Sequence, residues 1–310
     1  MTRFCPEGWL INETETKRAY SSPQKLSEAV TKGCVLEGIA EVCDAEHNLW
    51  VNLGCMRGII PRDEGAIGIK SGETRDIALL SRVGKPVCFT VSAIKEDRFG
   101  KLFALLSRRD AQVKCRKEYI KKLRPGDVVG ARITHLESFG AFCDIGCGIV
   151  ALLPINSISV SRISHPRDRF FVGEDIKAVV RSVSEDGKIT LTHRELLGTW
   201  EENAAAFTQG ETVSGIVRSV EPYGVFVELT PNLAGLAEPK NDIFIGQSAS
   251  VYVKSIIPDK MKVKLIIIDS FENSYTQNKK YFFTGEHMDL WEYSPKDSYK
   301  KIVTDFLEKT

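Results

Sequence analysis

One pattern occurs three times along this chain, and this internal repetition limits the folds open to it more than any other feature. Each copy begins with a glycine that precedes a run rich in β-branched residues, and the three starting glycines are Gly33, Gly126 and Gly210. The starts lie 93 and 84 residues apart, which is too long for a solenoid repeat and suits a small domain. The sequence therefore predicts three tandem domains.

Each copy continues through two further signatures of strand-forming residues. The first signature reads HNLWVNLG at 47–54, FGAFCDIG at 139–146 and YGVFVELT at 223–230. The second reads RGIIPRDE at 57–64, CGIVALLP at 147–154 and AGLAEPK at 234–240. Short apolar runs broken by Gly, Pro, Asn and Asp are typical of strands joined by hairpins. The three domains are therefore expected to be mainly all-β.

Alternation within the first signature predicts which side chains point into the core. Aliphatic residues alternate with an aromatic residue and a polar one, so a period of two directs the aliphatic side chains inward and the aromatic outward. The expected inward residues are Leu49, Val51 and Leu53, then Ala141, Cys143 and Ile145, then Val225, Val227 and Leu229. A large aromatic side chain on the polar face of all three copies indicates a binding surface.

A second ring precedes each strand aromatic by three residues. The residue after this first ring is Gly or Asn, which tolerate a positive φ, so we expect a tight bend that turns both rings onto one outer face. The ring pairs, with the bend residue between them, are His47 and Trp50 around Asn48, Phe139 and Phe142 around Gly140, and Tyr223 and Phe226 around Gly224. Each domain should therefore carry a platform of two rings.

The last strand of the second and third copies adds cations to this face. These strands lie in 181–192 and 254–266, and alternation predicts outward lysines. The cations expected to neutralise phosphates are Lys188, Lys262, Lys264 and Arg132. In the first copy the outward positions are Phe103 and Leu105. The first copy is therefore better suited to contact with protein than with phosphate.

The charge of the chain is unevenly distributed. The net charge is only +1, but residues 111–200 carry 14 basic and 10 acidic side chains, with a dense basic run in 108–124. A local basic surface is compatible with a polyanionic partner. The alternative interpretation is that the basic run at 108–124 is only the solvent-exposed face of a helix.

Rings and cations together suit single-stranded nucleic acid, which offers flat bases and a charged backbone. Stacking one base on an aromatic side chain contributes about 1–3 kcal/mol and tolerates any base. Tethering several weak sites raises the overall affinity through effective concentration. The alternative is that the rings cover loops or pack between neighbouring domains.

These motifs resemble the RNA-binding domain of the bacterial ribosomal protein S-one family. The resemblance covers about 33–268 and is strongest in the second copy, where GDVVGARI, FGAFCDIG, GIVALLP and GKITLT follow the family's order. It implies three five-stranded OB-fold barrels, with the three ring pairs stacking bases and Lys188 and Lys262 as the basic residues of the last strand. We expect the principal RNA site on the second copy, including its loop SRISHPRDRF at 161–170.

The resulting layout places a divergent first barrel between terminal and linking segments. The expected parts are an extension at 1–32 with a helix over Pro23–Lys32, barrels at 33–108, 125–197 and 210–269, a basic linker helix at 109–124, a second linker helix at 198–209, and a C-terminal segment at 270–310 with a hairpin around Gly285.

The sequence predicts a binding protein rather than an enzyme. It shows no phosphate-cradling glycine loop, nucleophile motif or metal-ligand spacing, so we expect no catalytic residues, metal or other cofactor. The scattered cysteines, the start without an apolar leader and the lack of a long apolar run predict a cytoplasmic monomer away from membranes. The expected function is binding of single-stranded RNA, above all messenger RNA, in translation with the small ribosomal subunit. The alternatives are a protein-interaction module with little RNA affinity and an RNA-turnover factor.

Overall fold

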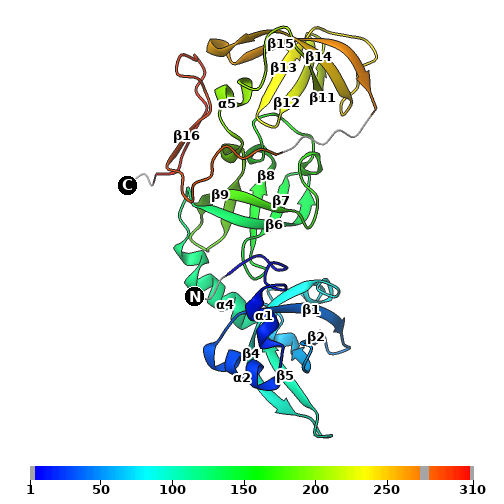
Figure 1. Ribbon diagram of the computed structural model, residues 1–310, viewed down its shortest axis with the longest axis vertical. Helices are drawn as coiled ribbons and strands as arrows, with labels where there is room; N and C mark the ends of the chain where they lie inside the picture. The colour runs from blue at the N-terminus through cyan, green and yellow to red at the C-terminus, as the bar shows by residue number, and fades with distance from the viewer. Residues whose placement is uncertain (1–3, 273–278, 308–310) are drawn as a thin grey trace. The chain divides into compact units, whose positions relative to one another are not determined.

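The computed structural model describes residues 4–272 and 279–307, and its strands form three closed five-stranded barrels (Figure 1). This confirms the prediction of three tandem OB-type barrels. The chain divides into two compact units. Unit 1 comprises Met1–Leu123, Gly130–Arg132 and Cys143–Ala151, and unit 2 comprises Arg124–Val129, Ile133–Phe142 and Leu152–Thr310.

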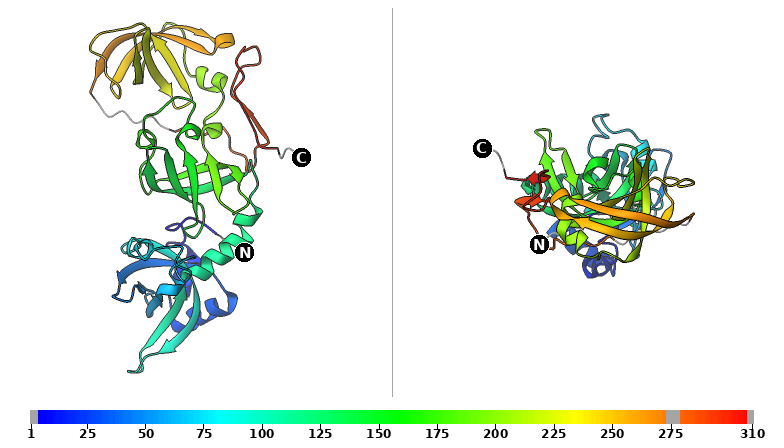
Figure 2. Two further views of the ribbon diagram at one scale, coloured as in Figure 1. Left: turned by 180° about the vertical axis from the view of Figure 1, so that it is seen from behind. Right: turned by 90° about the horizontal axis from the view of Figure 1, so that it is seen from above.

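The first barrel follows two short helices, α1 (Thr14–Ala19) and α2 (Pro23–Lys32), of which α2 has the predicted bounds. Its strands run in the order β1-β2-β3-β5-β4, and β3 pairs with β5 in parallel. The strands are β1 (Leu36–Cys43), β2 (Leu49–Asn52), β3 (Arg57–Ile60), β4 (Pro86–Glu96) and β5 (Leu102–Ser107), with the short helix α3 (Ile77–Leu80) before β4. The β4–β5 hairpin extends away from the rest of this barrel, as both side views show (Figures 1 and 2).

The second and third barrels repeat this topology. Their orders are β10-β8-β7-β6-β9 and β11-β12-β13-β15-β14, and in each the third strand pairs with the fifth in parallel. The second barrel consists of β6 (Val128–Glu137), β7 (Gly140–Asp144), β8 (Val150–Pro154), β9 (Asp175–Val183) and β10 (Ile189–Thr192). The third consists of β11 (Thr212–Glu221), β12 (Gly224–Thr230), β13 (Leu233–Ala237), β14 (Ser248–Ile257) and β15 (Lys262–Phe271).

The linking helices are shorter than the sequence predicts. Helix α4 (Arg108–Glu118) ends where Tyr119 leaves helical geometry, and a 3-10 turn follows at Ile120–Lys122. Helix α5 (Trp200–Ala204) begins only after Gly198, whose φ of +85° interrupts the expected helix. Thr199 then caps α5 by accepting a hydrogen bond from the backbone amide of Glu202. No helix in residues 4–272 and 279–307 is long and apolar enough to cross a membrane.

The C-terminal segment forms a different hairpin from the predicted one. Strand β16 (Leu290–Glu292) pairs antiparallel with β17 (Val303–Asp305), whereas 281–284, which precede Gly285, form no strand. The expected hairpin around Gly285 is therefore wrong. The aromatic residues Trp291, Tyr293 and Phe306 are buried in the hydrophobic cluster that also fills the third barrel. Burial of these rings explains the aromatic composition of the segment.

The barrel interiors confirm the alternation read from the sequence. All nine predicted inward residues of the three central strands are buried, from Leu49 in β2 to Leu229 in β12. Because successive residues of a strand face opposite sides, Trp50, Phe142 and Phe226 must then point outward. The core arrangement thus sets the orientation of the candidate binding face.

Candidate nucleic-acid interface

In the third barrel, the pairing of the strands places an aromatic residue and a lysine in one row that runs across three neighbouring strands. Phe226 of β12 lies opposite Leu236 of β13, and Leu236 lies opposite Lys264 of β15. Neighbouring strands lie about 4.8 Å apart, so the row is short enough for one nucleotide to span it. Lys262, two residues before Lys264, is exposed on the same side of β15. Lys262 and Lys264 form no ion pair with any residue that the structure describes.

The two rings of the third barrel are in direct contact at its surface. The Tyr223 and Phe226 centroids are 6.2 Å apart with an interplanar angle of 88°. Tyr223 is 65% exposed, and Phe226 is half-buried. An edge-to-face pair of this kind is stable by itself and keeps ring surface available to a third flat group.

The second barrel carries the same arrangement with an additional ring. The Phe139 and Phe142 centroids are 5.9 Å apart at 88°, and Phe139 is 54% exposed. On the other side of Phe142, the His135 ring of β6 stacks at 6.3 Å and 27°. The sequence reading missed His135, although its outward position next to the buried Leu136 was a usable signal. This barrel therefore presents a row of three rings.

The first barrel has no such platform. Trp50 donates its indole N–H to Asp44 at 3.0 Å, and the Arg57 guanidinium lies 5.6 Å from the Trp50 ring centroid. Within the described residues, no ring contact joins His47 to Trp50. The row that continues from Trp50 is apolar, since it passes through Ile59 to Leu105. The ring pair predicted from the sequence is thus not assembled here.

Two of the three bend residues act differently from the prediction, whereas Gly224 has the expected positive φ, at 157°. Gly140 has no positive φ, and in the first barrel the positive φ of 64° belongs to His47 rather than Asn48. A Cβ on Gly140 would lie 2.5 Å from the Leu153 carbonyl oxygen, and one on Gly224 would lie 2.5 Å from that of Ala237. The glycines are therefore required by the close approach of the neighbouring strand.

The other predicted cations have identifiable contacts. Lys188 is highly exposed at the turn before β10 and pairs with Asp186 at 2.5 Å. Arg132 is half-buried, and its Nη1 donates a hydrogen bond to the Glu7 carbonyl oxygen at 2.9 Å. Lys188 can leave Asp186 and bind a phosphate at little cost in free energy, because an exposed ion pair contributes little stability. Arg132 would first have to break its hydrogen bond to the Glu7 carbonyl oxygen.

The basic loop 161–170 contributes less to this face than expected. Arg169 is buried, and its guanidinium donates to the Glu228 carboxylate of β12, which also accepts from Arg218 at 2.9 Å. This part of the loop packs on the third barrel, so Arg169 cannot reach an RNA. Arg162 and Arg167 remain exposed.

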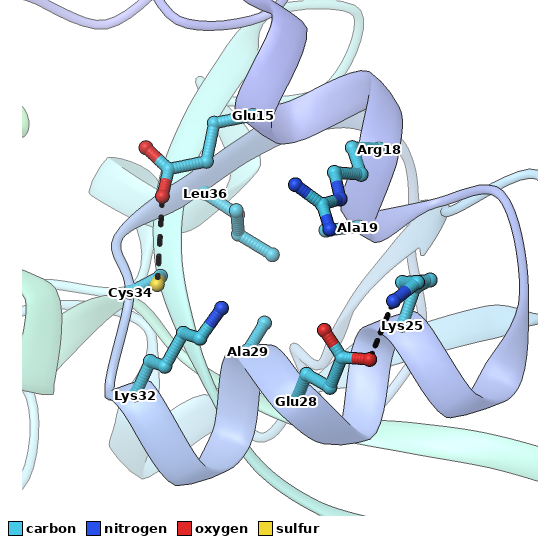
Figure 3. Close-up of a pocket in the computed structure, with 9 residues that line it drawn as sticks. All are labelled: Glu15, Arg18, Ala19, Lys25, Glu28, Ala29, Lys32, Cys34 and Leu36. Carbon is cyan, nitrogen blue, oxygen red and sulfur yellow. Dashed lines mark hydrogen bonds and ion pairs between the residues drawn. The ribbon is translucent and has the colours of Figure 1, made fainter.

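A separate small pocket lies between α1 and α2 in unit 1 (Figure 3). Charged side chains of both signs line it around Ala19, Ala29 and Leu36. Lys25 pairs with Glu28 at 2.6 Å, and Arg18 and Lys32 point their charged groups toward the pocket (Figure 3). The carboxylates offset most of the positive charge, so the pocket offers no strong anion site.

One family model and several known proteins are similar in sequence to this chain. A family model described as the S1 (S-one) RNA binding domain matches residues 122–194. The small ribosomal subunit protein bS1 of Streptococcus pneumoniae is 31% identical over 190 residues, which cover 56% of this chain and 46% of that protein. The bS1 of Rhizobium meliloti is 28% identical over 286 residues, which cover 86% of this chain and 48% of that protein. The bS1 homolog of Bacillus subtilis is 29% identical over 244 residues, covering 76% and 59%.

Among solved structures, a multidomain protein with nucleic acid binding domains from Streptococcus pneumoniae aligns with 78% of this chain and 75% of its own, at 16% identity and a TM-score of 0.26. The chain spans about half the length of the first curated relatives it matches, 46% and 48%. The matched segment holds the second barrel, and residues 122–194 belong to the S1 RNA-binding domain family.

Proposed function

We propose that this protein binds single-stranded RNA through the outer faces of its second and third barrels. The observation that carries the proposal is the pair of exposed edge-to-face ring contacts, Phe139 with Phe142 and Tyr223 with Phe226, at equivalent positions of the two barrels. Bases would stack on these rings, and Lys188, Lys262 and Lys264 would neutralise phosphates. Arg132 and Trp50 have a lesser role in the proposed site, because their side chains already form hydrogen bonds. His47 also has a lesser role, because no ring contact joins it to Trp50 among the residues that the structure describes.

The relatives support a role for this activity in translation. They are small ribosomal subunit proteins, so we propose messenger RNA and the small subunit as partners, with the protein acting as a cytoplasmic monomer without catalytic activity. The proposed RNA-binding domains are the second barrel, at 125–197, and the third barrel, at 210–269. The first barrel, at 33–108, is the divergent one of the three. Two platforms on one chain would bind one strand more tightly than either alone, through effective concentration.

Fluorescence anisotropy with a labelled single-stranded RNA tests the proposal. Affinity should fall steeply as salt rises, because each neutralised phosphate contributes about −0.7 to the slope of log K against log salt. The same RNA should stay intact for hours with Mg²⁺. Absence of binding at low salt would refute the proposal, and cleavage of the RNA would replace it with a turnover activity.

A second candidate function is docking on a protein through the first barrel. Its outward row of Trp50, Ile59 and Leu105 is apolar or aromatic, and Phe99 in the β4–β5 turn is 79% exposed. Co-sedimentation with small ribosomal subunits separates the two functions. A variant with alanine at all four platform rings should lose co-sedimentation if RNA carries the contact, and should keep it if the first barrel does.

A further inference from the structure

Two carboxylates lie beside the platform rings at equivalent positions of the second and third barrels. Glu137 is the last residue of β6 and Glu221 is the last residue of β11, and each precedes the first ring of its platform by two residues. Both side chains are half-buried. Neither forms an ion pair with a lysine or arginine in residues 4–272 and 279–307. Each platform therefore has a carboxylate that is available as a hydrogen-bond acceptor.

In the second barrel, His135 holds the Glu137 carboxylate at the ring row. The His135 ring stacks on Phe142 with centroids 6.3 Å apart, and its Nε2 lies 2.6 Å from Glu137 Oε1. Among the residues that the structure describes, none forms a hydrogen bond with Oε2 of Glu137. One oxygen of this carboxylate is thus fixed beside the rings, and the other is open to a ligand.

In the third barrel, a serine takes the place of this histidine. Ser219 lies opposite Phe226 in the pair of β11 with β12, and its hydroxyl donates to Glu221 Oε1 at 2.7 Å. The Oε2 atom of Glu221 has no hydrogen-bond partner in the described part of the chain. Two chemically different side chains, a histidine and a serine, therefore fix the carboxylate in the same way beside the same strand aromatic.

The first barrel shows what a carboxylate in such surroundings binds. Asp44 accepts the indole N–H of Trp50 at 3.0 Å, and it also accepts the backbone amides of Glu46 and Asn48. Both of its oxygens are therefore engaged inside the barrel. The phenyl rings at the corresponding positions of the other two barrels, Phe142 and Phe226, have no N–H to donate. Their carboxylates keep the capacity to accept ring N–H groups from a bound base.

We propose that Glu137 and Glu221 bind the Watson–Crick edge of a stacked base and make the two platforms prefer guanine, an inference that rests on the proposed RNA binding. An ionised carboxylate accepts hydrogen bonds and donates none. Guanine offers two adjacent donors on this edge, N1–H and the 2-amino group, which match the two carboxylate oxygens. Adenine, cytosine and uracil each place an acceptor beside the donor, and the carboxylate repels that acceptor.

The lysines and the carboxylates then have separate roles on the third barrel. Contacts with phosphates hold a strand in place without distinguishing its sequence, whereas contacts with base edges provide sequence preference. Lys262 and Lys264 are exposed cations that suit the phosphates of any strand. Glu221 repels phosphates and therefore contributes to affinity only through the base that it binds.

Anisotropy titrations of the full chain at one fixed salt concentration test this preference. Two uridine-rich RNAs are compared that are identical except for guanosines in one and adenosines in the other, at the same spaced positions. The guanosine RNA should bind about fivefold or more tightly, as expected for one good bidentate contact. A third RNA carries inosine, which keeps the N1 donor and lacks the 2-amino group, and should bind with intermediate affinity.

A pair of double variants assigns the preference to the two carboxylates. Glu137→Gln with Glu221→Gln keeps the shape of both side chains and removes their charge, so this variant should bind the guanosine and adenosine RNAs equally well. The matched control, Glu201→Gln with Glu286→Gln, removes two exposed carboxylates from α5 and from the C-terminal segment. This control has the same net charge as the first variant and should keep the guanosine preference.

The outcomes that contradict the proposal are distinct from failure of RNA binding itself. Equal affinity of the wild-type protein for the guanosine and adenosine RNAs would overturn the preference and leave RNA binding in place. A guanosine preference that persists in Glu137→Gln with Glu221→Gln would also overturn the proposal, because other residues would then distinguish the bases. Absence of binding to all three RNAs would refute the RNA-binding function and the preference with it.

Discussion

Arg169 and Glu228 form a buried ion pair that joins the loop before β9 to the outer face of β12. Their side chains are 3% and 0% exposed, and Arg218 adds a second guanidinium to the same carboxylate at 2.9 Å. Glu228 lies two residues after Phe226 on the same face of β12. The ion pair of Arg169 with Glu228 therefore covers the part of this face that the Phe226 ring leaves uncovered. This contact sets one limit of the proposed RNA surface.

Removing the charge of Glu228 should destabilise unit 2. In Glu228→Gln the buried Arg169 guanidinium loses its paired carboxylate and Arg218 keeps only Asp168 at 3.6 Å. Breaking a buried pair in this way costs about 3–5 kcal/mol. Urea unfolding followed by circular dichroism should show an earlier midpoint. The matched control is Glu238→Gln, which breaks an exposed pair with Lys254 and should change stability by no more than about 0.5 kcal/mol. Equal midpoints for the two variants would show that the Glu228 contact contributes little.

Truncating the second platform should weaken RNA binding without unfolding the barrel. Phe139→Ala with Phe142→Ala removes two stacking surfaces at about 1–3 kcal/mol each, so we expect anisotropy titrations to show a loss of affinity of about thirtyfold or more. Phe171→Ala is the control, because Phe171 is 66% exposed but lies outside the ring row. If both variants bind equally well, the bases do not stack on Phe139 and Phe142.

The lysines of β15 should govern the salt dependence rather than the base preference. Lys262→Gln with Lys264→Gln removes two exposed cations beside Phe226, and the slope of log K against log salt should become less steep by about 1.4. Lys300→Gln removes an exposed cation from the C-terminal segment and should leave the slope unchanged. If the double variant keeps the slope of log K against log salt that the wild-type protein has, other residues contact the phosphates.

The sequence predicted what depends on local periodicity and missed what depends on contacts between distant segments. Alternation correctly placed Val225 and Val227 inside and Phe226 outside, because the pleat of a strand follows directly from residue order. Burial of Arg169 could not be anticipated, since its partner Glu228 is 59 residues away on another barrel. The His135 ring, by contrast, could have been found from the alternation in β6, where it precedes the buried Leu136.

A buried histidine should make stability depend on pH between about 4 and 6.5. His193 lies under Phe170 and Tyr281, its Nδ1 bonds to the Ile158 carbonyl oxygen at 3.0 Å, and burial lowers its pKa to about 4. The cations Lys279 and Arg169 act in the same direction. Because the unfolded chain binds this proton near pH 6.5 and the folded protein only near pH 4, acid favours unfolding across that interval. The group therefore reduces stability by about 3 kcal/mol as pH falls through the interval, and has no effect above it.

Comparison of urea midpoints at several pH values for the wild type and His193→Gln isolates this effect, since all other titrating groups are shared. The acid-side decline should be shallower in His193→Gln, whereas His135→Gln, which alters an exposed ring, should follow the wild type. Proton NMR of the wild-type protein gives an independent readout that requires no variant. One of the five histidines should keep a constant chemical shift from pH 7 down to pH 5. If all five titrate near pH 6.5, His193 is open to water and its buried hydrogen bonds do not persist in solution.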